Sequence, residues 1–335
     1  MSDPSLTDEA DKQGPLLFGR VLDGEGGGRP ISWDEVDSWR PVVDSEVLWI
    51  HLDRTWPGLA EWLEETLVIP EPTAELLTSD QTRPRAFREQ DAIVATLRAI
   101  NFNAGAEPED MVSMQLWCDG RRLVTLRRLP LQTPRTICLE IDEGIGPLDA
   151  GSLITSLTEH LIDQMNHAIV DMNMAIDELE DIEDHTETGH MLARITTIRR
   201  NCLALKRHMS PQHEALEKIA STAPPWFESH DRREIAESID RLARCLDDLD
   251  ISKESALVLQ DDIRARALAG SSRTQYLLTI VAAIFLPLTF LTGLLGINVG
   301  GIPGATHHSA FWIVALICAA ILGVQLALFR YWKWF

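Results

Sequence analysis

The chain runs without a charged side chain for 20 residues from Tyr276 to Leu295, YLLTIVAAIFLPLTFLTGLL. A second uncharged run of 20 residues extends from Ala310 to Phe329, AFWIVALICAAILGVQLALF, with Gln325 as its one strongly polar side chain. Each run is long enough to cross a hydrocarbon core of about 30 Å as a helix. Two such runs in tandem disfavour the alternative of core helices in a soluble protein. The sequence therefore predicts a transmembrane hairpin over residues 273–335, with spans at 276–295 and 310–329 joined by an external loop, 296–309.

Charges around the two runs predict the orientation of the hairpin. Basic residues precede the first run and follow the second, at Arg264, Arg266, Arg273, Arg330 and Lys333. The loop carries no Lys, Arg, Asp or Glu. Positive charge stays on the cytoplasmic side of a membrane, so both termini are expected in the cytoplasm and the loop outside. We expect a multi-pass protein of a bacterial-type inner (plasma) membrane, with the lipid bilayer as one partner.

Composition narrows the function. The 51 acidic and 30 basic residues give a net charge of −21, which disfavours nucleic acid as a partner and fits cationic partners such as divalent cations. Five scattered cysteines form no Cys-x-x-Cys pair, which disfavours a zinc ribbon and a disulfide framework. Residues 1–14 are polar and acidic, so we expect a mobile tail without a signal peptide.

Residues 15–150 predict a cytoplasmic α/β domain. Strand-like runs lie at 47–52, 92–100, 111–117 and 123–127, and Asp119-Gly120 is typical of a hairpin turn between the last two. Short helices are expected at 32–39 and 57–66, the first beginning with Ser32 as a cap. The glycine cluster at 24–28 lacks the Lys-Ser/Thr ending of a phosphate-binding loop and predicts a turn.

Residues 151–272 predict a cytoplasmic helical bundle and stalk. One helix is expected from 152 to about 184, a second from 191 to about 218, and a third from about 226. In the third, apolar residues recur every three or four positions, as in a packed helix: Ile235, Ile239, Leu242, Leu246 and Leu249. Continued to residue 295, this helix would be about 100 Å long at about 1.5 Å per residue. The expected fold class is an α+β cytoplasmic domain, a long stalk helix and a two-span helical hairpin.

A heptad row along the third helix is the candidate pore lining. A two-span subunit cannot enclose a conduction path alone, so a transporting chain must assemble around an axis. Steps of seven residues give the row Asp240, Asp247, Glu254, Asp261, Leu268, Gln275, Ala282, Thr289 and Gly296. Carboxylate rings would concentrate cations, and the uncharged positions would offer a narrow polar path.

The row also allows simpler interpretations. Its acids could be the solvated face of a stalk, and Leu268 could serve either as a hydrophobic constriction or in ordinary helix packing. Gln and Thr are rarely placed on a lipid-facing helix, which favours the pore interpretation for Gln275 and Thr289.

The tripeptide Gly296-Ile297-Asn298, which opens the loop between two C-terminal spans, resembles the CorA metal-ion transporters. Magnesium channels of that family carry Met in the middle, followed by acidic residues. Here Ile297 and the continuation 299–304, VGGIPG, are similar to the ZntB-type zinc branch. The resemblance covers most of the chain, including 83–85, 97–101 and 110–114. It implies a homopentameric funnel that transports Zn²⁺, with Cd²⁺, Ni²⁺ and Co²⁺ as further candidates, and no cofactor.

Asn298 offers a carboxamide oxygen, and the loop holds no carboxylate, Cys or Lys, so we expect partly hydrated zinc to pass there. Two other sets could bind metal. His307 and His308 lie at the expected outer mouth, where a surface histidine pair can equally be uninvolved. His160, Asp163, His167 and Asp171 recur at three and four residues along one helix, a spacing that also suits surface ion pairs.

Inward flow is the default direction, because the membrane potential favours cation entry. Coupling to protons stays open, since neither run contains a carboxylate. The alternatives are a CorA-type magnesium or cobalt channel, zinc efflux, and a membrane-anchored metal sensor or scaffold. No Gly-x-Ser-x-Gly, His-Glu-x-x-His or Walker loop occurs, so an enzyme is not expected.

Overall fold

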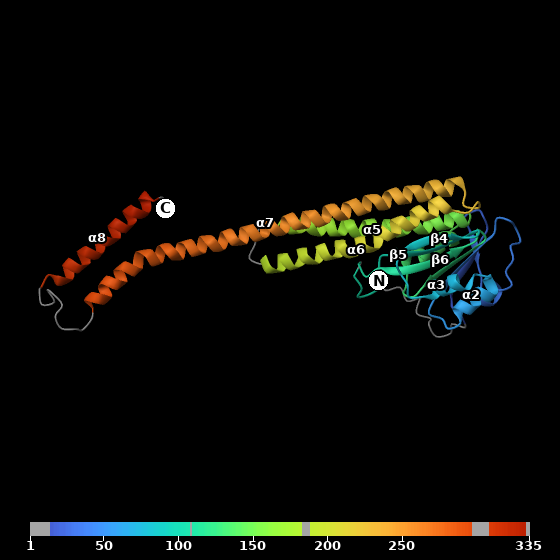
Figure 1. Ribbon diagram of the computed structural model, residues 1–335, viewed down its shortest axis with the longest axis horizontal. Helices are drawn as coiled ribbons and strands as arrows, with labels where there is room; N and C mark the ends of the chain where they lie inside the picture. The colour runs from blue at the N-terminus through green and yellow to red at the C-terminus, as the bar shows by residue number, and fades with distance from the viewer. Residues whose placement is uncertain (1–13, 108, 183–187, 297–307, 333–335) are drawn as a thin grey trace. The chain divides into compact units, whose positions relative to one another are not determined.

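The structure, a computed structural model, describes residues 14–107, 109–182, 188–296 and 308–332 (Figure 1). The chain divides into two compact units, Met1–Gln260 and Asp261–Phe335. Almost all of the expected N-terminal tail, as well as Ile297, Asn298 and His307, lies outside the described residues.

The first unit is built on a seven-stranded sheet with the order β2-β1-β3-β7-β6-β5-β4. The strands are β1 Leu16–Leu22, β2 Gly28–Pro30, β3 Val47–Asp53, β4 Arg85–Glu89, β5 Ala92–Ala99, β6 Val112–Cys118 and β7 Arg122–Arg127. The β3–β7 pair is parallel and the other pairs are antiparallel. Every residue of β6 is buried, because helices cover both faces of the sheet.

Two tight turns join strands as the sequence predicts. In the glycine cluster, the Asp23 carboxylate accepts hydrogen bonds from the backbone N–H groups of Glu25 and Gly27. Gly120 has a φ of +90° between β6 and β7, a value that an L side chain rarely adopts. The cluster is therefore a turn, and Asp119-Gly120 closes a hairpin.

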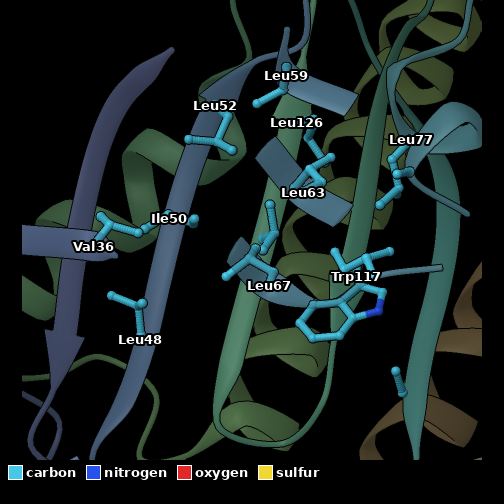
Figure 2. Packing of buried hydrophobic residues seen from close by; sticks show 14 of the residues in the cluster. Val36, Leu48, Ile50, Leu52, Leu59, Leu63, Leu67, Leu77, Trp117 and Leu126 are labelled. Carbon is cyan, nitrogen blue, oxygen red and sulfur yellow. The ribbon is translucent and has the colours of Figure 1, made fainter. Parts of the chain in front are cut away.

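Short helices cover one face of the sheet. They are α1 Trp33–Val36, α2 Leu59–Leu67 and α3 Glu71–Thr78. Alternate residues of β3, among them Leu48, Ile50 and Leu52, belong to one buried cluster with Leu59 and Leu63 of α2 (Figure 2). All five are 2 % exposed or less, so this face carries a dry core.

The helices α5 Ala150–Glu180 and α6 Thr188–Thr222 cover the other face, where α6 contacts β4 and β5 and α5 contacts β5. The remaining helices are α4 Gln132–Asp142 and α7 Ser229–Leu295. Asp149 caps α5 by accepting a hydrogen bond from the Ser152 backbone N–H at 2.7 Å. The second unit holds the end of α7 and α8, Ala310–Tyr331.

The expected fold class is confirmed: an α/β head, long helices, and two helices that are long and apolar enough to cross a membrane within the described residues. The ends of the expected strands and helices agree with the structure to within about four residues. The elements β1, β2, β4, α3 and α4 were not predicted from the sequence. The expected domain boundaries at residues 150 and 272 stay predictions.

Candidate pore-lining helix

In the first unit, α7 has a buried seam and an opposite exposed face. Ile235, Leu242 and Leu249 are at most 1 % exposed and recur every seven residues. Asp240 and Asp247 each lie five residues after a seam residue, which is about 140° around the helix. Both are exposed, and so is Glu254 one heptad later. The three acids therefore point away from the packed side of α7.

Polar contacts fix the rotation of α7 about its axis. Arg241 donates to Glu159 and Asp163 of α5 at 2.8 and 2.6 Å. On the α6 side, the Lys206 ammonium lies 2.5 Å from the Asp250 carboxylate. The hydrogen bond from Lys206 lowers the pKa of Asp250. Because these contacts lie on the flanks of the seam, they hold the acidic face outward.

The acidic face is not neutralised within the first unit. Asp240, Asp247 and Glu254 have no ion-pair partner in the described part of the chain. Asp240 also lines an open groove of about 620 Å³ with Glu214 and Glu217 of α6. Unpaired carboxylates on one helix face create a negative potential that attracts cations.

In the second unit, the remaining row residues are exposed on α7: Asp261, Leu268, Gln275, Ala282, Thr289 and Gly296. Asp261 lies 3.8 Å from Arg264, so its charge is partly balanced. Leu268 is 69 % exposed and has room to face another molecule. Whether these side chains line a pore stays a prediction.

Among the described residues of the second unit, a hydrogen bond joins α7 to α8. The Gln325 side-chain N–H donates to the Ala283 carbonyl at 3.1 Å. Among the described residues of this unit, Ile263, Ile280 and Phe329 are the buried apolar ones. Most other apolar side chains of the two helices are exposed, as expected for surfaces that lipid or further subunits cover.

The histidine set on α5 is not brought together as one metal cluster in the described structure. His160 lies 3.1 Å from Glu140 of α4, and Asp163 pairs with Arg241. His167 and Asp171 are exposed, as is His308 before α8. Their roles in metal binding stay predictions.

A different trio of ligand-type side chains does come together: Asp149, His230 and Asp231. The sequence did not predict this trio because Asp149 and His230 lie 81 positions apart, and no spacing rule links a cap of one helix to the first turn of another. Only the packing of α5 against α7 reveals it.

A family model and two named relatives match most of this chain. The family model described as CorA-like Mg²⁺ transporter protein matches residues 44–330. The chain is 34 % identical over 331 residues to the divalent cation transporter CmaX of Pseudomonas aeruginosa, covering 98 % of both chains. It is 36 % identical over 305 residues to the zinc transport protein ZntB of Pectobacterium atrosepticum, covering 90 % of both.

Solved structures agree. The full-length CmaX structure matches with a TM-score of 0.84 at 33 % identity, over 97 % of this chain and 100 % of that one. The CorA magnesium transporter from Methanocaldococcus jannaschii shares the fold, with a TM-score of 0.77 at 16 % identity over 95 % and 99 %. The expected family is thus confirmed by sequence and by fold: the chain belongs to the CorA family of membrane metal-ion transporters and is not an enzyme.

Proposed function

We propose that the chain is the subunit of a zinc transporter in which identical copies, five by resemblance, place α7 around a central axis. The observation that carries this proposal is the outward acidic face of α7 opposite its buried seam. The 36 % identity to a protein named as a zinc transport protein supports zinc as the cargo.

In this proposal, Asp240, Asp247 and Glu254 of each subunit form carboxylate rings that raise the local cation concentration. Gln275 and Thr289 then offer oxygens to a hydrated ion along the span, and Leu268 narrows the path between the two regions. Asn298, outside the described residues, supplies a ring of carboxamides at the outer mouth.

Direction follows from the membrane potential in the proposed orientation, with both termini in the cytoplasm of a bacterial inner membrane. Each positive charge gains about 2.3 kcal/mol per 100 mV on entry, and Zn²⁺ gains about twice that. Uptake therefore needs no coupling ion, whereas efflux would need one.

Flux into proteoliposomes tests the proposal. The purified protein should carry radioactive zinc inward when the lumen is negative, and a pH gradient imposed alone reveals any proton coupling. No zinc flux above protein-free vesicles, in either direction, would overturn it. Asn298→Ala should abolish uptake while the purified variant keeps the elution volume and the thermal stability of the parent.

A second candidate is a transporter of broader divalent specificity. The 34 % identity to a protein named as a divalent cation transporter favours it. Competition of unlabelled Mg²⁺, Co²⁺, Ni²⁺ and Cd²⁺ against zinc flux separates the candidates. Equal competition by magnesium would favour the broader one.

A further inference from the structure

Three ligand-type side chains meet where the first turn of α5 lies against the first turn of α7. His230 Nε2 lies 3.1 Å from Asp231 Oδ1 and 3.8 Å from Asp149 Oδ2. One ligand atom from each residue lies within 4.8 Å of the others. All three residues belong to the first unit.

The Asp231 carboxylate is the unusual member of this trio. Its side chain is 1 % exposed, and its Oδ2 accepts the Glu228 backbone N–H at 2.8 Å. Its Oδ1, which faces His230, is buried and accepts no hydrogen bond from any described residue. Burial of a carboxylate oxygen without a hydrogen-bond donor is costly, so a positively charged neighbour would stabilise this atom.

The backbone around Asp231 is shaped to receive that carboxylate. Gly151 lies in the first turn of α5, and a Cβ at this position would overlap the Asp231 carboxyl group. The absence of a side chain there lets the α5 backbone approach the acid. The same burial raises the pKa of Asp231 to about 6.

We propose that Asp149, His230 and Asp231 form a zinc site that ties the start of α7 to the start of α5. Ligand atoms about 2.0–2.2 Å from a tetrahedral Zn²⁺ lie about 3.4 Å from one another, between the two distances from His230. Asp149 Oδ1 accepts a hydrogen bond from the Ser152 N–H, so Oδ2 is the oxygen left for the ion. A water molecule completes the tetrahedron.

The donor chemistry selects zinc over the harder cations. One imidazole with two carboxylates suits Zn²⁺, whereas Mg²⁺ and Ca²⁺ prefer oxygen ligands alone. Glu228 Oε2 lies 3.7 Å from His230 Nδ1, the ring nitrogen that the ion does not use. A carboxylate there orients the imidazole for metal binding. The site does not depend on the proposed transport function.

The competing explanation is an ion pair between a protonated His230 and the two carboxylates. The two explanations differ for Asp231→Asn. The asparagine oxygen can still accept the Glu228 N–H, and the uncharged amide removes a buried negative charge. Under the zinc proposal, the metal-free variant is as stable as the parent or more stable, yet it loses the ion. Under the ion-pair explanation, the metal-free variant is less stable than the metal-free parent.

Zinc binding to the full-length protein in detergent, stripped with chelator and titrated at pH 7, tests the site. The parent should bind one more zinc ion per chain than His230→Ala or Asp231→Asn, and its melting temperature with zinc should rise by roughly 5 °C more. Any residual binding at the site should be at least about 100-fold weaker in both variants. His213→Ala is the matched control, because His213 pairs with a single carboxylate, Glu217.

Cobalt provides a direct readout of the ligand geometry. Co²⁺ added to the stripped parent and to His213→Ala should give the intense visible absorption of a four-coordinate ion, and neither site variant should show it. Equal zinc stoichiometry in all four proteins would overturn the site. A lower metal-free melting temperature for Asp231→Asn, with zinc stoichiometry unchanged, would also overturn it and assign the trio to an ion pair.

Discussion

His51 lies in the centre of the sheet, 2 % exposed, and its Nδ1 is 2.8 Å from the Thr125 hydroxyl. Burial lowers the pKa of this imidazole from 6.5 to about 3, and the nearby Arg127 adds to the effect. The unfolded chain takes up a proton near pH 6.5, whereas the folded chain does so only near pH 3. The stability that the neutral His51 contributes is therefore fully present above pH 6.5 and is lost as the pH falls toward 3.

We expect the free energy of unfolding to fall by about 1.4 kcal/mol between pH 7.5 and pH 5.5 through His51 alone. Denaturant unfolding at the two pH values, followed by tryptophan fluorescence, measures this loss. His51→Asn should remove it, because the amide does not titrate. His167→Asn controls for the loss of an imidazole at an exposed position. An unchanged pH dependence in His51→Asn would contradict the assignment.

Gly120 is required for two reasons that can be separated. Its φ is +90°, and a Cβ there would lie 2.6 Å from the Trp226 ring. Gly58, with a φ of +80°, has no heavy atom within 4 Å of such a Cβ. Gly58→Ala should cost about 1 kcal/mol of stability from backbone strain alone. Gly120→Ala should cost about 1–3 kcal/mol more, because the ring must also move. Equal losses in thermal unfolding would show that Trp226 does not constrain this turn.

Among the elements, α7 was the most predictable from sequence. Its apolar repeat and its heptad row of acids both follow from helical periodicity, which is local. Ile235, Leu242 and Leu249 are fully buried, whereas Ile239 and Leu246 are half-buried because they lie on the flanks of the seam.

The missed elements lack such a local signal. β4, RAFRE, contains three charged residues in five and lies at the sheet edge, so its pairing with β5 rather than its composition makes it a strand. α3 begins with Glu71-Pro72. Proline in the first turn of a helix is favourable, but the same sequence is also typical of a turn. In these segments tertiary contacts outweigh propensity.

Asp247 and its neighbour Asp248 allow a matched test of the acidic row. Both are exposed on α7, but their side chains point about 100° apart around the helix. If the row faces the axis, Asp247→Asn should lower zinc flux at subsaturating zinc by about 2–10-fold, since one charge is lost from every subunit near the path. Asp248→Asn should lower it less. The difference should shrink in high salt, which screens exposed charges. Equal effects at low salt would place the row away from the path.

For the whole molecule, the sequence predicts the family and the fold class but not the full set of candidate sites. Two uncharged runs and one loop tripeptide sufficed to predict the two candidate membrane helices and the family, and membership in a transporter family decides against a metal sensor or scaffold. The trio of Asp149, His230 and Asp231 exists only through the packing of distant helices, which no periodicity encodes.

The assembly itself can be tested at Leu268, which is 69 % exposed on α7. If copies of α7 surround an axis with the row inward, cysteines at this position approach one another, and Leu268→Cys should form disulfide-linked subunits under mild oxidation. Gly270→Cys is the control, because it lies about 200° around the helix and a Cβ there meets no atom within 4 Å. Both are made in a Cys318→Ala background, where the four other cysteines are buried. Non-reducing gels should show a linked dimer for Leu268→Cys alone. A disulfide-linked dimer of Gly270→Cys instead would mean that the polar row faces away from the axis, and this result would contradict the pore model.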